Sequence, residues 1–164
     1  MSQTEEQRRF SLEYYYKTMK NGTYVGLNPT EKTRDSIEAL QKRIGVKNPV
    51  GRDELHCTLI YSEKGNPDFR PYDRGMEAEA VELKLFGENK NILVLTIHSD
   101  DLIMRHDQLR HLGLRHSFDP YSPHITLSYD YQGESLDAEI LYDENGKSVV
   151  HIEFEDEYAE PLEK

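Results

Sequence analysis

The chain has 164 residues, of which 36% are apolar, and carries a formal net charge of −11. This size suits one domain with a hydrophobic core, and no apolar run is long enough to span a bilayer. The single cysteine, Cys57, excludes an internal disulfide and a cysteine-rich zinc site, and it is typical of a reducing cytoplasm. We therefore expect a cytoplasmic protein without a membrane partner.

Acidic residues are concentrated at the C-terminal end. Residues 130–164 contain twelve Asp or Glu against two Lys, whereas segments 41–52 and 105–118 are rich in Lys, Arg and His. A long polyanion would be repelled by the acidic tail, because non-specific nucleic-acid binding depends on many phosphate contacts. We therefore expect no long nucleic acid as partner, and interpret the tail as a solubilising surface. The basic segments suit a local positive site for a small phosphate-bearing ligand, or are simply solvated helix ends.

In the first half of the chain, the pattern predicts an arm, mobile or helical, over residues 1–20, followed by a folded domain over residues 21–164. A helix over 31–44 is predicted from its apolar stripe, with Thr30 as the N-cap and Gly45 as the stop. The other elements predicted in this half are a strand at 23–27, a strand at 55–62, a loop at 65–75 and paired strands at 76–86 and 92–98.

The second half begins with a helix predicted to start at Asp100 or Asp101 and to run to about Leu112. A loop over 114–123 leads to a strand from His124, and strands at 136–142 and 148–154 flank a turn at 143–147. This order is α+β, and a helix followed by a strand with a histidine occurs twice. We therefore expect one two-lobed domain, with antiparallel sheets and a groove between the lobes.

Two short strings, His56–Tyr61 and His124–Tyr129, both fit H-x-T-L-x-Y, and no other histidine has a threonine two residues on. In an extended chain, side chains i and i+2 point to the same face, so each string presents an imidazole beside a hydroxyl. The alternate residues, including Cys57 and the two tyrosines at the ends of the strings, are expected to point into the core.

Two imidazoles facing one groove suit concerted acid–base chemistry, because the pKa of histidine lies near neutrality. Neighbouring hydroxyls can stabilise charge that develops on a phosphoryl group. We predict attack of a ribose 2′-hydroxyl on the adjacent phosphodiester, giving a 2′,3′-cyclic phosphate, with neither metal nor cofactor. The predicted catalytic residues are His56, Thr58, His124 and Thr126.

The remaining histidines are interpreted as structural or peripheral. His106, His111 and His116 are spaced by five residues, which spreads them around a helix rather than onto one metal-binding face. We expect these three on the surface or at the groove rim. His98 and His151 lie in predicted strands and are expected to be structural.

The doubled H-x-T motif resembles that of the 2H phosphoesterase superfamily, whose two-lobed α+β fold carries one motif per lobe. Within it, the chain is most similar to the phage anti-CBASS cyclic-nucleotide phosphodiesterases, which degrade the cyclic di- and trinucleotide signals of bacterial antiphage defence. The similarity covers roughly residues 20–160. It includes Gly-Thr-Tyr-Val-Gly at 22–26, Glu-Leu-His-Cys-Thr at 54–58, Pro-Tyr-Ser-Pro-His-Ile-Thr at 120–126 and the acidic C-terminal strand.

The resemblance implies a metal-independent enzyme that acts in the bacterial cytoplasm on cyclic oligonucleotides such as 3′,3′-cyclic GMP–AMP. It also implies that Tyr24 and Tyr121 contact the nucleotide, that Glu153 reads a base edge and that Tyr158 stacks on a base. Core packing is the alternative for Tyr24 and Tyr121. Alternative functions are a 2H esterase for RNA ends or 2′,5′-oligoadenylate, and a non-catalytic cyclic-nucleotide sponge. The motif does not assign the base and the acid.

Overall fold

The computed structural model describes residues 22–162 except 66–68, 73, 115–120 and 135; the arm predicted at 1–20 lies outside the described residues. The elements are β1 (Thr23–Pro29), α2 (Glu31–Ile44), the 3₁₀ helix η2 (Arg52–Glu54), β2 (Cys57–Ser62), β3 (Met76–Phe86), β4 (Ile92–His98), α3 (Asp100–His111), β5 (His124–Ser128), the 3₁₀ helix η3 (Ala138–Leu141) and β6 (His151–Pro161).

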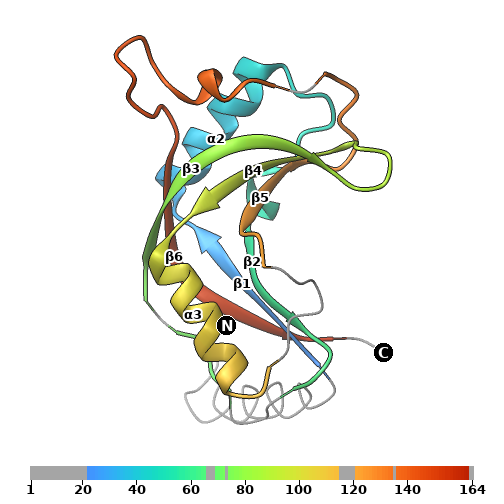
Figure 1. Cartoon of the computed structure of the whole chain (residues 1–164), viewed down its shortest axis with the longest axis vertical. Coiled ribbons are helices and arrows are strands. Elements are labelled where there is room, and N and C mark those ends of the chain that lie inside the picture. Colours follow the sequence, from blue (N-terminus) through green and yellow to red (C-terminus); the bar gives the residue numbers. More distant parts are fainter. Residues whose placement is uncertain (1–21, 66–68, 73, 115–120, 135, 163–164) are drawn as a thin grey trace, which may run out of the picture.

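The described strands form a closed antiparallel ring in the order β1-β2-β5-β4-β3-β6 (Figure 1). The ring consists of two three-stranded halves, β6-β1-β2 and β3-β4-β5, and each central strand leads through a helix to an H-x-T strand. The halves join through β3 and β6 on one side, and through the single register pair Cys57↔Ile125 of β2 and β5 on the other. The predicted α+β fold with two similar lobes is therefore confirmed.

The two helices begin at side-chain caps. The Thr30 hydroxyl accepts a hydrogen bond from the first turn of α2, and Gly45 ends this helix in the left-handed conformation at φ 74°. The predicted bounds of α2 are thus confirmed. α3 begins at Asp100, as predicted, and its N-cap is Ser99, whose side chain accepts the bond from the first turn. Asp100 and Asp101 occupy the first turn, where they complement the positive end of the helix dipole.

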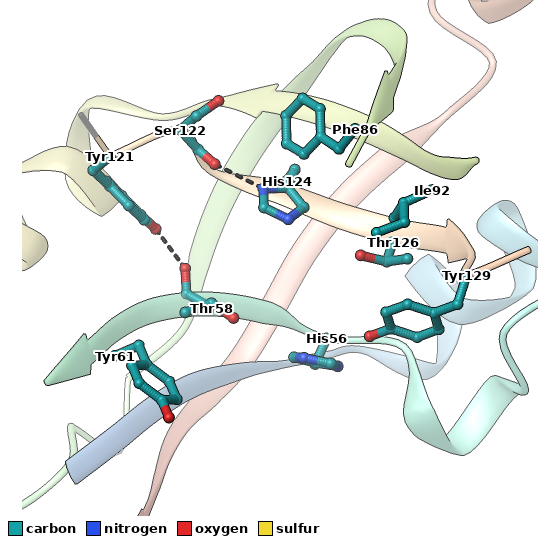
Figure 2. Close-up of a pocket in the computed structure, with 10 residues that line it drawn as sticks. All are labelled: His56, Thr58, Tyr61, Phe86, Ile92, Tyr121, Ser122, His124, Thr126 and Tyr129. Carbon is teal, nitrogen blue, oxygen red and sulfur yellow. Dashed lines mark hydrogen bonds between the residues drawn. The ribbon is translucent and has the colours of Figure 1, made fainter. Parts of the chain in front are cut away.

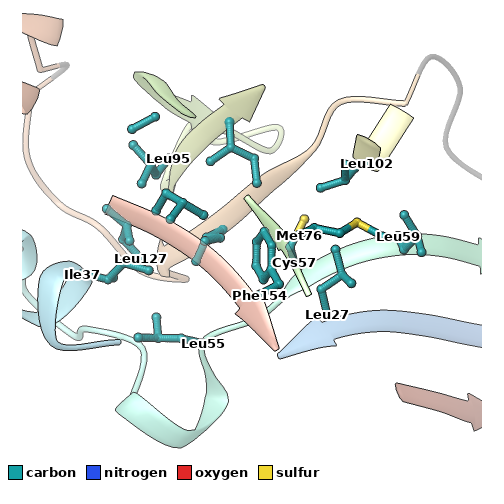
Figure 3. Packing of buried hydrophobic residues seen from close by; sticks show 14 of the residues in the cluster. Leu27, Ile37, Leu55, Cys57, Leu59, Met76, Leu95, Leu102, Leu127 and Phe154 are labelled. Atoms are coloured by element: carbon teal, nitrogen blue, oxygen red, sulfur yellow. The ribbon is translucent and has the colours of Figure 1, made fainter. Parts of the chain in front are cut away.

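The hydrophobic core receives side chains from both halves of the ring (Figure 3). Leu27, Cys57, Leu95, Leu127 and Phe154 are all at most 2% exposed, and burying a large apolar side chain contributes about 1.5–3 kcal/mol. Burial also raises the pKa of the Cys57 thiol to about 12. Cys57 is therefore the buried, unreactive thiol that the alternation of the strand predicted.

The strand predicted at 136–142 is wrong. This segment instead contains η3, which begins where the Asp137 side chain accepts a hydrogen bond from Glu139 N at 3.1 Å and which buries Leu141. The turn that follows is formed as predicted, with Asp143 N donating to Lys147 O at 2.8 Å. The strand predicted at 148–154 begins later and continues to the end of β6.

Most of the described acidic residues in the tail are exposed, which agrees with a solubilising surface, but the tail also contains the structural strand β6. β6 pairs with β1 and β3, and it buries the carboxylate of Glu157 completely. Arg105 on α3 donates to Glu157 from Nε at 2.6 Å and from Nη2 at 2.9 Å, and its guanidinium lies 3.5 Å from the centre of the Tyr72 ring. This buried ion pair fastens α3 to β6.

Removing one partner of the buried pair should destabilise the protein. We expect Glu157→Gln to lower the free energy of unfolding by about 3–5 kcal/mol, because the Arg105 charge would stay buried and uncompensated. The matched control is Glu155→Gln, an exposed position on the same strand, which should change the value by less than about 0.5 kcal/mol. Urea unfolding of both variants measures this, and equal midpoints would contradict a stabilising role for the pair.

Candidate active site

The two H-x-T motifs meet where β2 touches β5. The antiparallel pair Cys57↔Ile125 places His56 opposite Thr126 and Thr58 opposite His124, on the face away from Cys57. These four side chains line a hollow of about 570 Å³ (Figure 2), a volume typical of small-molecule sites. The lining residues are His56, Thr58, Tyr61, Phe86, Ile92, Tyr121, Ser122, His124, Thr126 and Tyr129.

Both histidines are oriented by the same local contact. Nδ1 of His56 donates to the carbonyl of Glu54 at 2.7 Å, and Nδ1 of His124 donates to the carbonyl of Ser122 at 2.8 Å. Because a carbonyl oxygen only accepts, Nδ1 carries the hydrogen in each ring. In the neutral form, Nε2 is therefore the proton acceptor, and in the charged form it is a donor.

The environment of His124 disfavours its protonated form. Burial lowers the pKa of His124, the hydrogen bond to Ser122 opposes this change, and the nearby charge of His56 lowers the pKa further. The Phe86 ring, 5.0 Å away in an edge-to-face arrangement, forms part of this apolar surrounding. His124 therefore stays neutral to lower pH than an ordinary histidine.

Thr58 is held by two of the tyrosines named from the sequence. The hydroxyls of Tyr24 and Thr58 are hydrogen-bonded at 2.9 Å, and the hydroxyl of Tyr121 donates to the Thr58 carbonyl at 2.7 Å. Burial is the main reason that the pKa of each phenol is raised, so both phenols stay protonated. Tyr121 lines the hollow, whereas Tyr24 is not among its lining residues.

Tyr61 and Tyr129 line the hollow, so their predicted core location is wrong. The register between β1 and β2 skips Leu59, and the register between β4 and β5 skips Leu127. Each skipped residue is a β-bulge, which moves the following side chains to the opposite face. The recurrence of tyrosine at the same place in both strings was the sequence signal for this pair.

Tyr158 lines a second hollow of about 460 Å³, which also includes His56 and Asn28. Its ring packs directly on Gly26, where an added Cβ would lie only 2.5 Å from the ring. A side chain at position 26 would therefore displace Tyr158. The structure thus places Tyr158 in the same hollow as His56, and its stacking on a base stays a prediction.

Glu153 is not brought together with the two histidines. Its carboxylate lies 2.5 Å from Nε2 of His151, and its backbone N–H donates to the hydroxyl of Thr33 on α2 at 2.8 Å. The hydrogen bond to His151 is the main reason that its pKa is lowered. Among the described residues that line either hollow, Glu153 is absent.

The arginines from the basic segments serve other purposes in the described structure. Arg52 forms ion pairs with the carboxylates of Glu31, Asp35 and Glu38 on α2, and Arg105 pairs with Glu157. No lysine or arginine is found among the described residues that line the larger hollow. The predicted positive site is thus wrong for these two arginines; Arg115 and His116 lie outside the described residues.

Not all of the other described histidines have the burial that their predictions imply. His106, expected at the surface or groove rim, is 4% exposed, whereas His111 is exposed as expected. His98 and His151 were expected to be structural, and their side chains are 60% and 52% exposed.

The described part of the chain shows neither a metal-binding cluster nor a membrane-spanning helix. It contains no group of three or more His, Cys, Asp or Glu side chains arranged to hold a metal ion. None of its helices has the length and apolar character required to cross a membrane.

Comparisons with known proteins agree with this geometry. LigT of E. coli in its apo form superimposes with a TM-score of 0.51 at 16% identity, covering 85% of this chain and 83% of LigT. A protein described as a phosphoesterase gives a TM-score of 0.50 at 19% identity, covering 71% of this chain and 77% of that protein. These similarities support the two-lobed fold.

The sequence comparisons are more specific. The anti-CBASS protein Acb1 of Salmonella phage S16 is 35% identical over 148 residues, which cover 90% of this chain and 92% of the phage protein. The protein of the same name in Enterobacteria phage T4 is 34% identical over 149 residues, with the same coverage. The family model of anti-CBASS protein Acb1 matches residues 21–164. The chain therefore belongs to the anti-CBASS protein Acb1 family.

Proposed function

We propose that this protein counters CBASS defence in the bacterial cytoplasm by cleaving the 3′–5′ bonds of cyclic di- or trinucleotide signals such as 3′,3′-cyclic GMP–AMP. The observation that carries this proposal is the pair of histidines on one hollow, each with Nδ1–H bound to a carbonyl two residues upstream. Such a pair can accept one proton and donate another during the same displacement. Family membership and the phosphoesterase fold support the choice of substrate.

We assign the base to His124 and the acid to His56, because burial and the His56 charge lower the pKa of His124. Nε2 of His124 accepts the proton of the ribose 2′-hydroxyl, and the 2′-oxygen forms a bond to phosphorus. The bond from phosphorus to the 5′-oxygen breaks, and Nε2–H of His56 donates its proton to that oxygen. The products are a 2′,3′-cyclic phosphate and a 5′-hydroxyl, and water can open the cyclic phosphate with the two roles reversed.

The hydroxyls of Thr58 and Thr126 lie beside the opposite histidines, where they can donate to the non-bridging phosphate oxygens. With no described Lys or Arg on the larger hollow, these hydroxyls and the charged imidazole carry the stabilisation of the phosphoryl group. Tyr121, Tyr129 and Tyr158 offer aromatic faces for the bases, and base–aromatic stacking contributes about 1–3 kcal/mol per base.

The substrate is tested by incubating the protein with 3′,3′-cyclic GMP–AMP in EDTA and analysing the products by mass spectrometry. We expect linear products from the wild type and unchanged substrate from His56→Ala and His124→Ala, because each variant lacks one proton-transfer group. His98→Ala, which removes an exposed histidine outside both hollows, is the control and should retain full activity.

Two other results would contradict this substrate assignment. Tight binding by calorimetry with complete recovery of intact ligand would identify a sponge. Faster turnover of linear RNA ends or 2′,5′-oligoadenylate than of cyclic dinucleotides would identify an end-processing esterase.

The assignment of base and acid is tested with a nucleoside 3′-(p-nitrophenyl phosphate), whose leaving group needs no acid. We expect this substrate to restore turnover by His56→Ala but not by His124→Ala. The same assignment places the acidic limb of the kcat/KM profile below about pH 6.5, since the pKa of the base is lowered. Rescue of His124→Ala instead would exchange the two roles.

The threonines are tested by removing the hydroxyl without changing the shape. Thr58→Val and Thr126→Val should each raise the barrier by about 1.5–3 kcal/mol, the usual cost of a lost hydrogen bond to a charged group, with the larger effect on kcat. Thr58→Ser and Thr126→Ser keep the hydroxyl and serve as matched controls. Unchanged turnover in both valine variants would remove the hydroxyls from the mechanism.

A further inference from the structure

One buried side chain has no part in the chemistry proposed above. His106 on α3 is 4% exposed; its Nδ1 donates to the carbonyl of Leu59 at 2.7 Å, and its ring stacks on Tyr121 at 4.0 Å with only 4° between the planes. Tyr121 in turn donates to the carbonyl of Thr58 at 2.7 Å. His106 thus acts on two consecutive carbonyls of β2, on one directly and on the other through Tyr121.

These two carbonyls lie at the bulge of β2. A bulge leaves backbone groups outside the regular ladder, and a buried carbonyl without a donor destabilises the structure. The donors at Thr58 and Leu59 therefore favour this register over a regular strand. In a regular strand, which has no bulge, the side chains would keep alternating between the two faces, and Tyr61 would point away from the hollow.

The second motif has a corresponding arrangement. The carbonyl of Leu127, at the bulge of β5, accepts from Gln41 Nε2 at 3.1 Å and from Val50 N at 2.8 Å. Gln41 thus lies on α2, the helix before β2, but binds β5. His106 lies on α3, the helix before β5, but binds β2. Because glutamine does not titrate, the shared requirement is a buried N–H donor rather than an ionisable ring.

We propose that His106 is a positioning residue, which holds Thr58 toward the reacting phosphate by fixing the carbonyls of Thr58 and Leu59. Gln41 does the same for Thr126 through the adjacent carbonyl of Leu127. The catalytic effect rests on the proposed phosphodiesterase function. The placement of the threonine side chains does not, and it is measured separately.

The catalytic test compares His106→Phe, which keeps an aromatic ring but no donor, with His106→Asn, whose amide can replace Nδ1–H. We expect His106→Phe to lower kcat on the order of 10- to 100-fold with little change in KM, because a misplaced group acts on the transition state. His106→Asn should restore most of kcat. Equal activity of the phenylalanine variant and the wild type would overturn the proposal.

A double-mutant cycle separates positioning from a general loss of structure. If His106 acts through Thr58, His106→Phe should cost little further kcat when Thr58 is already valine. Independent losses that multiply in the double variant would show that His106 does not act through Thr58.

The placement itself is measured by NMR of the threonine methyl groups. His106→Phe should shift the Thr58 methyl signal and leave that of Thr126 in place, and Gln41→Leu should do the reverse. If the wild type cleaves no cyclic nucleotide but these shifts occur, the proposed function fails and the positioning role stands. Unmoved methyl signals in folded variants would overturn the positioning role whatever the activity.

Discussion

The candidate site depends on one short contact between the two lobes. β2 and β5 share the single register pair Cys57↔Ile125 and then separate. Beyond this pair, the edge of β2 is bound by His106 from α3, and that of β5 by Gln41 from α2. The contact brings both H-x-T motifs onto one face, and the separation leaves space between them for a ligand. Full pairing of the two strands would have given a flat sheet surface instead.

The proposed reaction involves a phosphate group, although the protein carries a net charge of −11. Outside the lining of the larger hollow, Arg52 binds three carboxylates of α2 and Arg105 binds the buried Glu157. The described lining of the hollow contains histidines, hydroxyls and aromatic rings but no carboxylate. In the proposed reaction, a charged imidazole supplies positive charge beside the phosphoryl group, and burial favours the neutral form of His124.

Predictions were correct where the structure depends on interactions between residues that are close in sequence, and wrong where it depends on distant residues. The bounds of α2 and of the paired strands β3 and β4 were predicted because periodicity, caps and turn residues act within a few positions. The segment at 136–142 was assigned wrongly because the Asp137 cap and the burial of Leu141 outweigh its β-propensity. Arg52 and Arg105 do not contribute to a positive site at the larger hollow, because they bind carboxylates that lie far away in sequence.

Three features are evident from the amino-acid sequence because they are local: the doubled motif, the repeated helix–strand unit and the alternation that places each histidine beside its threonine. The three-dimensional fold was needed to show that Tyr61 and Tyr129 line the hollow, that Glu153 binds His151 and that His106 is buried against Tyr121. Bulges, strand register and ion pairs depend on residues brought together from distant parts of the chain, and the pattern within one segment carries no information about them.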